Sequence, residues 1–118
     1  MNIKEIVTEY NKKELKENQI SKEAIANAEK LEQKFKENNI KGYDIVPSPL
    51  GEISFEWTND SFSFGISVNS KEIATLEHVV FATKECFIAV YNINDDAEVF
   101  ELLEFATDIL KSYKEKGY

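Results

Sequence analysis

The chain has 118 residues, of which 42% are hydrophobic and 12% aromatic, and its formal net charge at pH 7 is −8. This length suits one domain that buries about two-thirds of its unfolded surface, and the composition is that of a globular protein. All fourteen cationic side chains are lysines, because arginine is absent. Direct binding of nucleic acid is therefore not expected, since proteins that grip phosphates usually present a basic face with arginine.

The hydropathy of the chain and its few cysteines and histidines disfavour several other classes of protein. No apolar run approaches the roughly 20 residues that cross a bilayer. The first residues, Met-Asn-Ile-Lys-Glu, lack the basic-then-apolar order of a signal peptide, so we expect a cytoplasmic protein without membrane contact. The single cysteine, Cys86, excludes an internal disulfide framework and a cysteine-built zinc site. With one histidine, His78, few metal or catalytic combinations remain, and no cofactor is expected.

The negative charge lies in the second part of the chain. Residues 1–40 contain eight lysines and eight acids, whereas residues 41–118 contain six lysines and fourteen acids. The stretch 85–110 has no lysine at all. Its acids are Glu85, Asp95, Asp96, Glu98, Glu101, Glu104 and Asp108. A surface of one sign favours a basic partner, or it serves solubility alone.

Two helices are predicted in the first forty residues. An apolar stripe begins at Ile3 but fades after Leu15, so residues 1–18 are expected to contain a short, weakly anchored helix. Between residues 22 and 37, alanine, leucine and phenylalanine recur at helical spacing among lysines and glutamates. This pattern predicts an amphipathic helix that packs one side on a sheet, with Ser21 as its N-cap.

The middle of the chain reads as strands. Residues 52–58 and 61–68 alternate apolar and polar side chains on either side of a short turn, which predicts two half-buried antiparallel strands. Residues 43–46 suit a short first strand or an extended lead-in, and 72–76 a weakly patterned strand. Residues 85–93 are apolar on both sides, which predicts a strand that is central or covered by a helix.

The chain closes with a long predicted helix. Asn94 to Asp96 form its cap, an apolar stripe runs from Val99 to Tyr113, and Gly117 ends it. The order α-α-β-β-β-β-α predicts a single α+β domain over residues 1–118. In this fold an antiparallel sheet of about four strands is covered by the N-terminal helices and the long C-terminal helix.

One stretch, residues 45–68, also carries a resemblance. It contains Pro47-Ser-Pro-Leu-Gly51-Glu-Ile-Ser-Phe-Glu-Trp57, followed by an alternating strand. It resembles a group of small, largely uncharacterised bacterial proteins with a Pro-x-x-x-Gly-Gly-Val/Ile-x-Leu-Glu-Trp strand, often encoded near toxin–antitoxin or mobile-element genes. The sequence departs from that pattern at the glycine pair, where it has Gly51-Glu52, and at Phe55, which replaces leucine. The resemblance implies a fold neighbourhood and an association with conflict systems, and it carries over no catalytic residue.

Catalysis is not expected. Cys86 and His78 are the one plausible nucleophile–base pair, but Cys86 lies in an apolar strand, and free cysteines in such settings are usually buried and structural. A lone histidine is weak evidence for a metal, and adjacent acids such as Asp95 and Asp96 at a helix start are more typical of a cap. Phosphate loops, nucleophile elbows and zinc signatures are all absent.

The acidic stretch is the candidate binding surface. Glu98, Glu101, Glu104 and Asp108 are spaced by three or four residues, so they form a ridge on the outer face of the last helix. With Glu85, Asp95 and Asp96 they are the predicted partner-binding residues. A purely solvated face is the simpler interpretation, although such faces usually mix both signs of charge.

The sequence thus predicts a small acidic interaction protein of the antitoxin or phage anti-defence (anti-CRISPR-like) type. Its expected partner is a basic nucleic-acid-handling protein, such as a nuclease effector or toxin, bound by a surface that imitates nucleic-acid charge. The alternative is a scaffold domain that self-associates, as a homodimer, through a strand edge. A small enzyme using Cys86 and His78 is the least favoured hypothesis.

Overall fold

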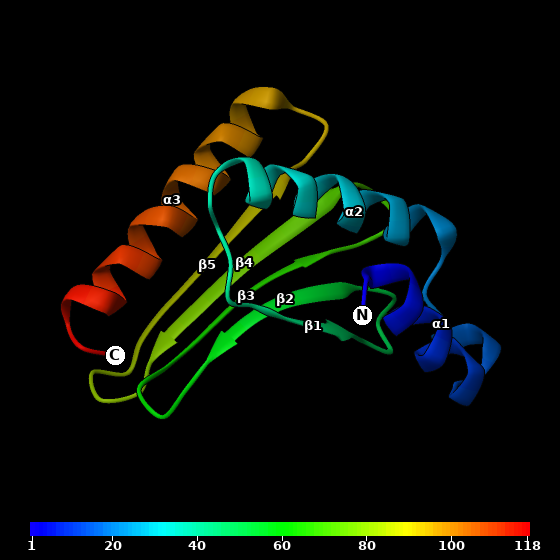
Figure 1. Ribbon diagram of the computed structural model, residues 1–118, viewed down its shortest axis with the longest axis horizontal. Helices are drawn as coiled ribbons and strands as arrows, with labels where there is room; N and C mark the ends of the chain where they lie inside the picture. Colours follow the sequence, from blue (N-terminus) through cyan, green and yellow to red (C-terminus); the bar gives the residue numbers. More distant parts are fainter.

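The computed structural model describes all 118 residues and consists of one antiparallel sheet with helices on one of its faces (Figure 1). The elements are α1 (Ile3–Lys13), a 3-10 turn (Lys16–Asn18), α2 (Lys22–Glu37), β1 (Asp44–Pro47), β2 (Ile53–Thr58), β3 (Phe62–Val68), β4 (Ile73–Val80), β5 (Glu85–Asn92) and α3 (Asp96–Glu115). The strands lie in the sheet in chain order, so β1 and β5 are its two edges. The α+β class is therefore confirmed.

Side chains of asparagine fix the first two of the turns that join β2, β3, β4 and β5. Asn59 Oδ1 accepts hydrogen bonds from the backbone N–H groups of Ser61 (2.8 Å) and Phe62 (3.1 Å). Asn69 Oδ1 accepts from those of Lys71 (2.8 Å) and Ile73 (3.1 Å). Such turns set the pairing register, and register decides which face of each strand is buried.

The alternating side chains of β2 and β3 put an aromatic and aliphatic surface against α2. Phe35 of α2 is fully buried, with its ring centroid 5.0 Å from that of Phe55, 5.9 Å from Tyr43 and 6.2 Å from Trp57. Trp57 in turn stacks on Phe64 at 4.9 Å. Edge-to-face and offset contacts of this kind add to the area that aromatic side chains bury. This cluster is the centre of the core.

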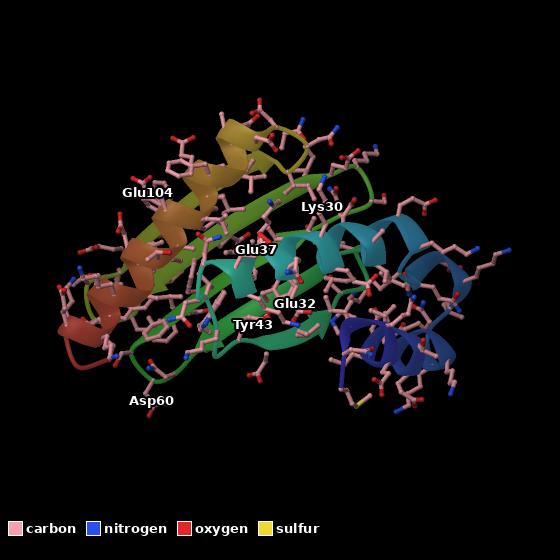
Figure 2. All side chains as sticks on the ribbon, turned by 45° about the horizontal axis from the view of Figure 1, so that its top comes forward. Lys30, Glu32, Glu37, Tyr43, Asp60 and Glu104 are labelled. Carbon is pink, nitrogen blue, oxygen red and sulfur yellow. The ribbon has the colours of Figure 1, made fainter.

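Polar contacts hold α2 to the start of the sheet. Ser21 caps the helix, as predicted, through its hydroxyl and the backbone N–H of Ala24 (3.2 Å). At the far end, the Tyr43 hydroxyl donates to Glu32 on α2 at 2.7 Å; both side chains lie beneath the helix in Figure 2. The indole N–H of Trp57 donates to the carbonyl of Lys41 at 2.8 Å. The loop after α2 is thereby tied to both layers.

The last helix, α3, begins and ends as the sequence predicts. Asp95 Oδ1 accepts from the backbone N–H groups of Ala97 (2.9 Å) and Glu98 (3.3 Å). Gly117 adopts a φ of 74° just after the helix, a conformation that favours glycine. The apolar side chains on the inner face of α3 are buried, and the helix runs beside β5, the last strand at one edge of the sheet (Figure 1).

The sheet differs from the prediction in the number and the position of its strands. It has five strands rather than about four, because Asp44–Pro47 pairs with β2 as a full edge strand. Pro47 fits there because an edge strand can lack one backbone donor. The strand predicted at 72–76 extends to Val80, because pairing with β3 and β5 continues through a segment without a clear pattern.

Two further expectations differ from the structure. The strand predicted as central or covered by a helix is the edge strand β5: α3 packs against one of its faces, but most of its residues are exposed. The apolar side chains on both faces therefore did not indicate a central position. In the N-terminal region α1 ends at Lys13, earlier than the predicted segment, and Ile3 and Val7 on it are fully buried.

The aromatic cluster gives a stability prediction. Phe35→Ala is expected to lower the free energy of unfolding by about 3–5 kcal/mol, because it removes a fully buried ring from the centre of the core. Phe100→Ala is the matched control: that ring is 68% exposed, and exposed substitutions usually change stability by less than about 0.5 kcal/mol. Urea unfolding followed by tryptophan fluorescence measures both, and equal effects would contradict the assignment of the core.

Candidate partner-binding surface

A groove runs along the free edge of the sheet, between β5 and the outer flank of α3. It is a hollow of about 410 Å³. The residues that line it are Phe87 and Tyr91 on β5 and Phe100, Glu101, Glu104, Phe105 and Asp108 on α3. The groove therefore combines an aromatic floor with an acidic rim, and we refer to these seven residues as the edge groove.

The aromatic part of the edge groove arises because β5 turns directly into α3. The helix runs back along the strand, so Phe105 comes to lie over Phe87 with 4.9 Å between ring centroids. Phe87 is 40% exposed and Phe100 is 68% exposed, whereas Tyr91 is buried. Exposed aromatic rings beside one another are the kind of side chain that contributes most to protein–protein binding.

The carboxylates of the acidic rim form no ion pair, and no lysine lines the edge groove. Glu101, Glu104 and Asp108 are exposed, and Glu104 projects from α3 away from the sheet (Figure 2). The ion pairs of the structure all lie within α1 and α2. Burial raises the pKa of the Tyr91 hydroxyl, and the nearby carboxylate of Glu101 raises it further. The floor of the groove thus lies in a negative field.

The structure separates the seven predicted acids into groups. Glu101, Glu104 and Asp108 line the edge groove. Asp95 is used as the cap of α3, and Glu98 Oε1 accepts a hydrogen bond from the backbone N–H of Asn92 at 3.1 Å. These two carboxylates already have partners within the chain.

The remaining two acids lie elsewhere. Asp96 borders a separate hollow of about 290 Å³ between α2 and α3, together with Lys30, Lys34 and Glu37. The charges of that hollow are mixed, so it does not continue the acidic rim. Glu85 is exposed at the start of β5, and its side chain is on the same face of the sheet as that of His78.

Sequence reasoning did not identify the aromatic residues of the edge groove. Phe100 lies outside the buried stripe of α3, which was a visible signal of exposure. Phe87 and Tyr91 gave no such signal, because apolar side chains on both faces of a strand suit burial and exposure equally.

Cys86 and His78 lie on opposite faces of the sheet. Cys86 pairs with Val79, whereas His78 pairs with Phe87, and successive strand residues point to opposite sides. The two side chains therefore do not form a nucleophile–base pair. Cys86 is exposed, so the expectation that it is buried was wrong. The physical reason is that no helix covers that face of the edge strand.

His78 is instead part of the packing beneath α3. Its Nδ1 lies within hydrogen-bonding distance of the Tyr113 hydroxyl. Burial raises the pKa of Tyr113 to about 12, so this hydroxyl remains protonated and donates to the ring nitrogen. Burial lowers the pKa of His78, and Lys116 lowers it further, while Glu85 partly offsets both. A neutral histidine that accepts a hydrogen bond is consistent with these shifts.

The face of the sheet opposite the helices is uncovered. Gly65 lies between Glu56 and Glu77 across three strands, and the missing side chain leaves a shallow hollow of about 190 Å³. Serine and threonine hydroxyls surround it. The structure contains no group of three or more histidine, cysteine or acidic side chains placed to bind a metal ion. None of its helices combines the length and the hydropathy required to cross a membrane.

Comparison with protein-family models, curated proteins and solved structures gives no match to the chain. The resemblance of residues 45–68 to small bacterial proteins therefore stays a prediction. Arguments about function rest on the edge groove itself.

The environment of His78 gives a prediction about pH. The pKa of His78 in the folded chain lies below 6.5, the ordinary value for histidine, so the unfolded chain binds a proton more readily. Stability from the neutral ring is present above pH 6.5 and is lost as the pH falls towards the folded pKa. The free energy of unfolding of the wild type should therefore fall more between pH 7.5 and 5.5 than that of His78→Gln. Parallel pH profiles in urea unfolding would contradict this.

The position of Cys86 gives a second prediction. An aromatic disulfide reagent should titrate the thiol fully in the folded protein, because Cys86 lies on an uncovered face of an edge strand. Absorbance of the released thiolate measures the reaction. A thiol that reacts only after addition of denaturant would show that this face is covered in solution, and Cys86→Ser supplies the blank.

Proposed function

We propose that the chain is a small acidic protein-binding module whose partner is a basic protein. The observation that carries this proposal is the edge groove, in which exposed phenylalanines lie beside unpaired carboxylates. Charge complementarity speeds encounter and rejects acidic partners, while buried aromatic anchors supply affinity. The groove meets both requirements at one place on the surface.

The role that fits this surface is inhibition of a nucleic-acid-handling protein, as in antitoxins and anti-defence proteins. Such targets present lysine- and arginine-rich surfaces to phosphates. A rim of three carboxylates on successive turns of α3 resembles a short row of phosphates in sign and in repetition. The absence of arginine and the net charge of −8 support a protein partner over nucleic acid itself.

Self-association through a strand edge is the second candidate, and the exposed strand β5 favours it. The charge of the edge groove opposes it. Two-fold pairing of β5 with a second β5 would place both copies of α3 on the same face, with Glu101 and Glu104 of one copy facing those of the other. Like charges so placed repel each other. A heterologous basic partner removes this repulsion.

Charge reversal tests the proposal. Glu101→Lys/Glu104→Lys should lower affinity for the basic partner at least about tenfold at physiological salt, whereas Glu17→Lys/Glu29→Lys, with the same change in net charge, should not. Immobilised protein is incubated with bacterial lysate at low salt and at about 0.5 M salt, where screening shortens the reach of charges to a few ångströms. Retained proteins are identified by mass spectrometry.

The proposal requires that a basic nucleic-acid-binding protein is retained at low salt, released at high salt and lost only with the variant in the edge groove. Equal loss with both double variants would indicate general charge attraction. A chain that retains nothing and has the mass of a dimer in solution would favour self-association.

A further inference from the structure

The backbone of β5 presents free hydrogen-bonding groups along the edge of the sheet. The backbone N–H of Ile93 donates to Glu72 at 2.9 Å, so residue 93 faces the neighbouring chain segment. In an antiparallel ladder, successive residues direct their N–H and C=O groups to opposite sides. Phe87, Ala89 and Tyr91 therefore bond to β4. The groups of Cys86, Ile88 and Val90 point outward.

The row of free backbone groups ends at Asn92, where a side chain of α3 accepts the outward N–H. The N–H of Asn92 also points outward, and Glu98 on α3 accepts it at 3.1 Å. An incoming strand can therefore pair with Cys86, Ile88 and Val90 but cannot continue past Asn92. The unpaired edge thus has a defined length and a defined stop.

The two faces of an added strand would meet different surroundings. Side chains on the helix side would enter the edge groove, between Phe87 and the carboxylates of Glu101 and Glu104. Side chains on the open side would lie beside Ile88 and Val90, which are 60% and 61% exposed. One face of the added strand meets aromatic rings and acids, and the other meets aliphatic side chains.

We propose that β5 receives an extended segment of the basic partner as a sixth strand, in which basic and apolar residues alternate. This inference rests on the proposed function and specifies how the partner docks. Lysine or arginine stems would pack on Phe87 and Phe105 while their charged heads reach the acidic rim. Apolar residues on the alternate positions would cover Ile88 and Val90. Main-chain hydrogen bonds supply affinity in such strand addition, and the alternating side chains supply specificity.

The acidic charge beside β5 disfavours a second copy of the chain as the added strand, and the β1 edge is a poorer site for strand addition than the β5 edge. A second copy of the chain would bring the apolar and acidic residues of its own β5 and α3, without lysine to meet the rim. At the other edge, β1 contains Pro47 and packs beside α1, so it offers a shorter and interrupted row of backbone groups.

The test uses the full chain and an end-capped peptide in which lysine and valine alternate over about seven residues, the length of a typical strand. Amide hydrogen exchange is followed by NMR with and without the peptide. The amides of Cys86, Ile88 and Val90 should become protected, whereas those of Phe87 and Ala89, already bonded to β4, should not change. This period-two pattern is specific to strand pairing.

A second measurement alters only the peptide, so folding of the chain is unaffected. Methylation of the backbone nitrogen at one alternate set of positions should lower affinity about tenfold or more, because it removes the donors that face β5. Methylation at the other set should have little effect, because those nitrogens face away. Glu101→Gln/Glu104→Gln should weaken binding of the unmodified peptide, and Glu17→Gln/Glu29→Gln should not.

The outcomes separate this inference from the function on which it rests. Binding that ignores the methylation pattern and leaves the three amides unprotected would overturn strand addition while acidic docking stands. No binding of the lysine–valine peptide would also overturn it, and the lysate experiment would then decide the function independently. Protection of the three amides without peptide, increasing with protein concentration, would show that a second copy is the occupant.

Discussion

The packing of Phe35 into the aromatic face of β2 and β3 is the contact on which the rest of the structure depends. It places α2 across the early strands, and the hairpin order then leaves α3 to cover β4 and β5. Two helices, each about 10 Å wide, match five strands spaced by about 4.8 Å. One face of the sheet is therefore covered, and no element remains for the other face or for the outer edge of β5. The exposed surface follows directly from how the core is filled.

The two edges of the sheet differ in how they are protected against pairing with another strand, so only the β5 edge is open to a partner. β1 carries Pro47 and has α1 beside it, which are ordinary means of limiting pairing with other chains. β5 has neither proline nor lysine. Instead, carboxylates of α3 lie beside β5, and Glu98 accepts the hydrogen bond of the backbone N–H at its last residue, Asn92. Acids discourage pairing with a second acidic copy while they attract a basic segment, so the same side chains serve solubility and selection of the partner.

The candidate surface is assembled from three independent properties of one segment. Residues 85–92 supply a strand edge, residues 96–108 supply acids, and phenylalanines from both supply apolar area. Each property alone is common on proteins, since charged helix faces are usual and isolated exposed aromatics need no explanation. Their coincidence in a groove of about 410 Å³ is what distinguishes this place from the polar hollow around Gly65. It also connects the acidic stretch to a mode of binding that charge alone does not specify.

The sequence by itself determined the α+β class, the helix at 22–37, the capped helix that begins after Asp95 and the central hairpin, because each depends on local periodicity and on capping or turn residues. Only the tertiary structure decided that β5 is an edge strand, that Cys86 is exposed and opposite to His78, and that three of seven acids share a groove with Phe87 and Phe105. Those facts depend on which element covers which strand, and an apolar run such as 85–93 has the same pattern whether neighbours cover both faces or only one. The periodicity of a segment indicates that it is a strand, whereas its burial depends on which other elements pack against it.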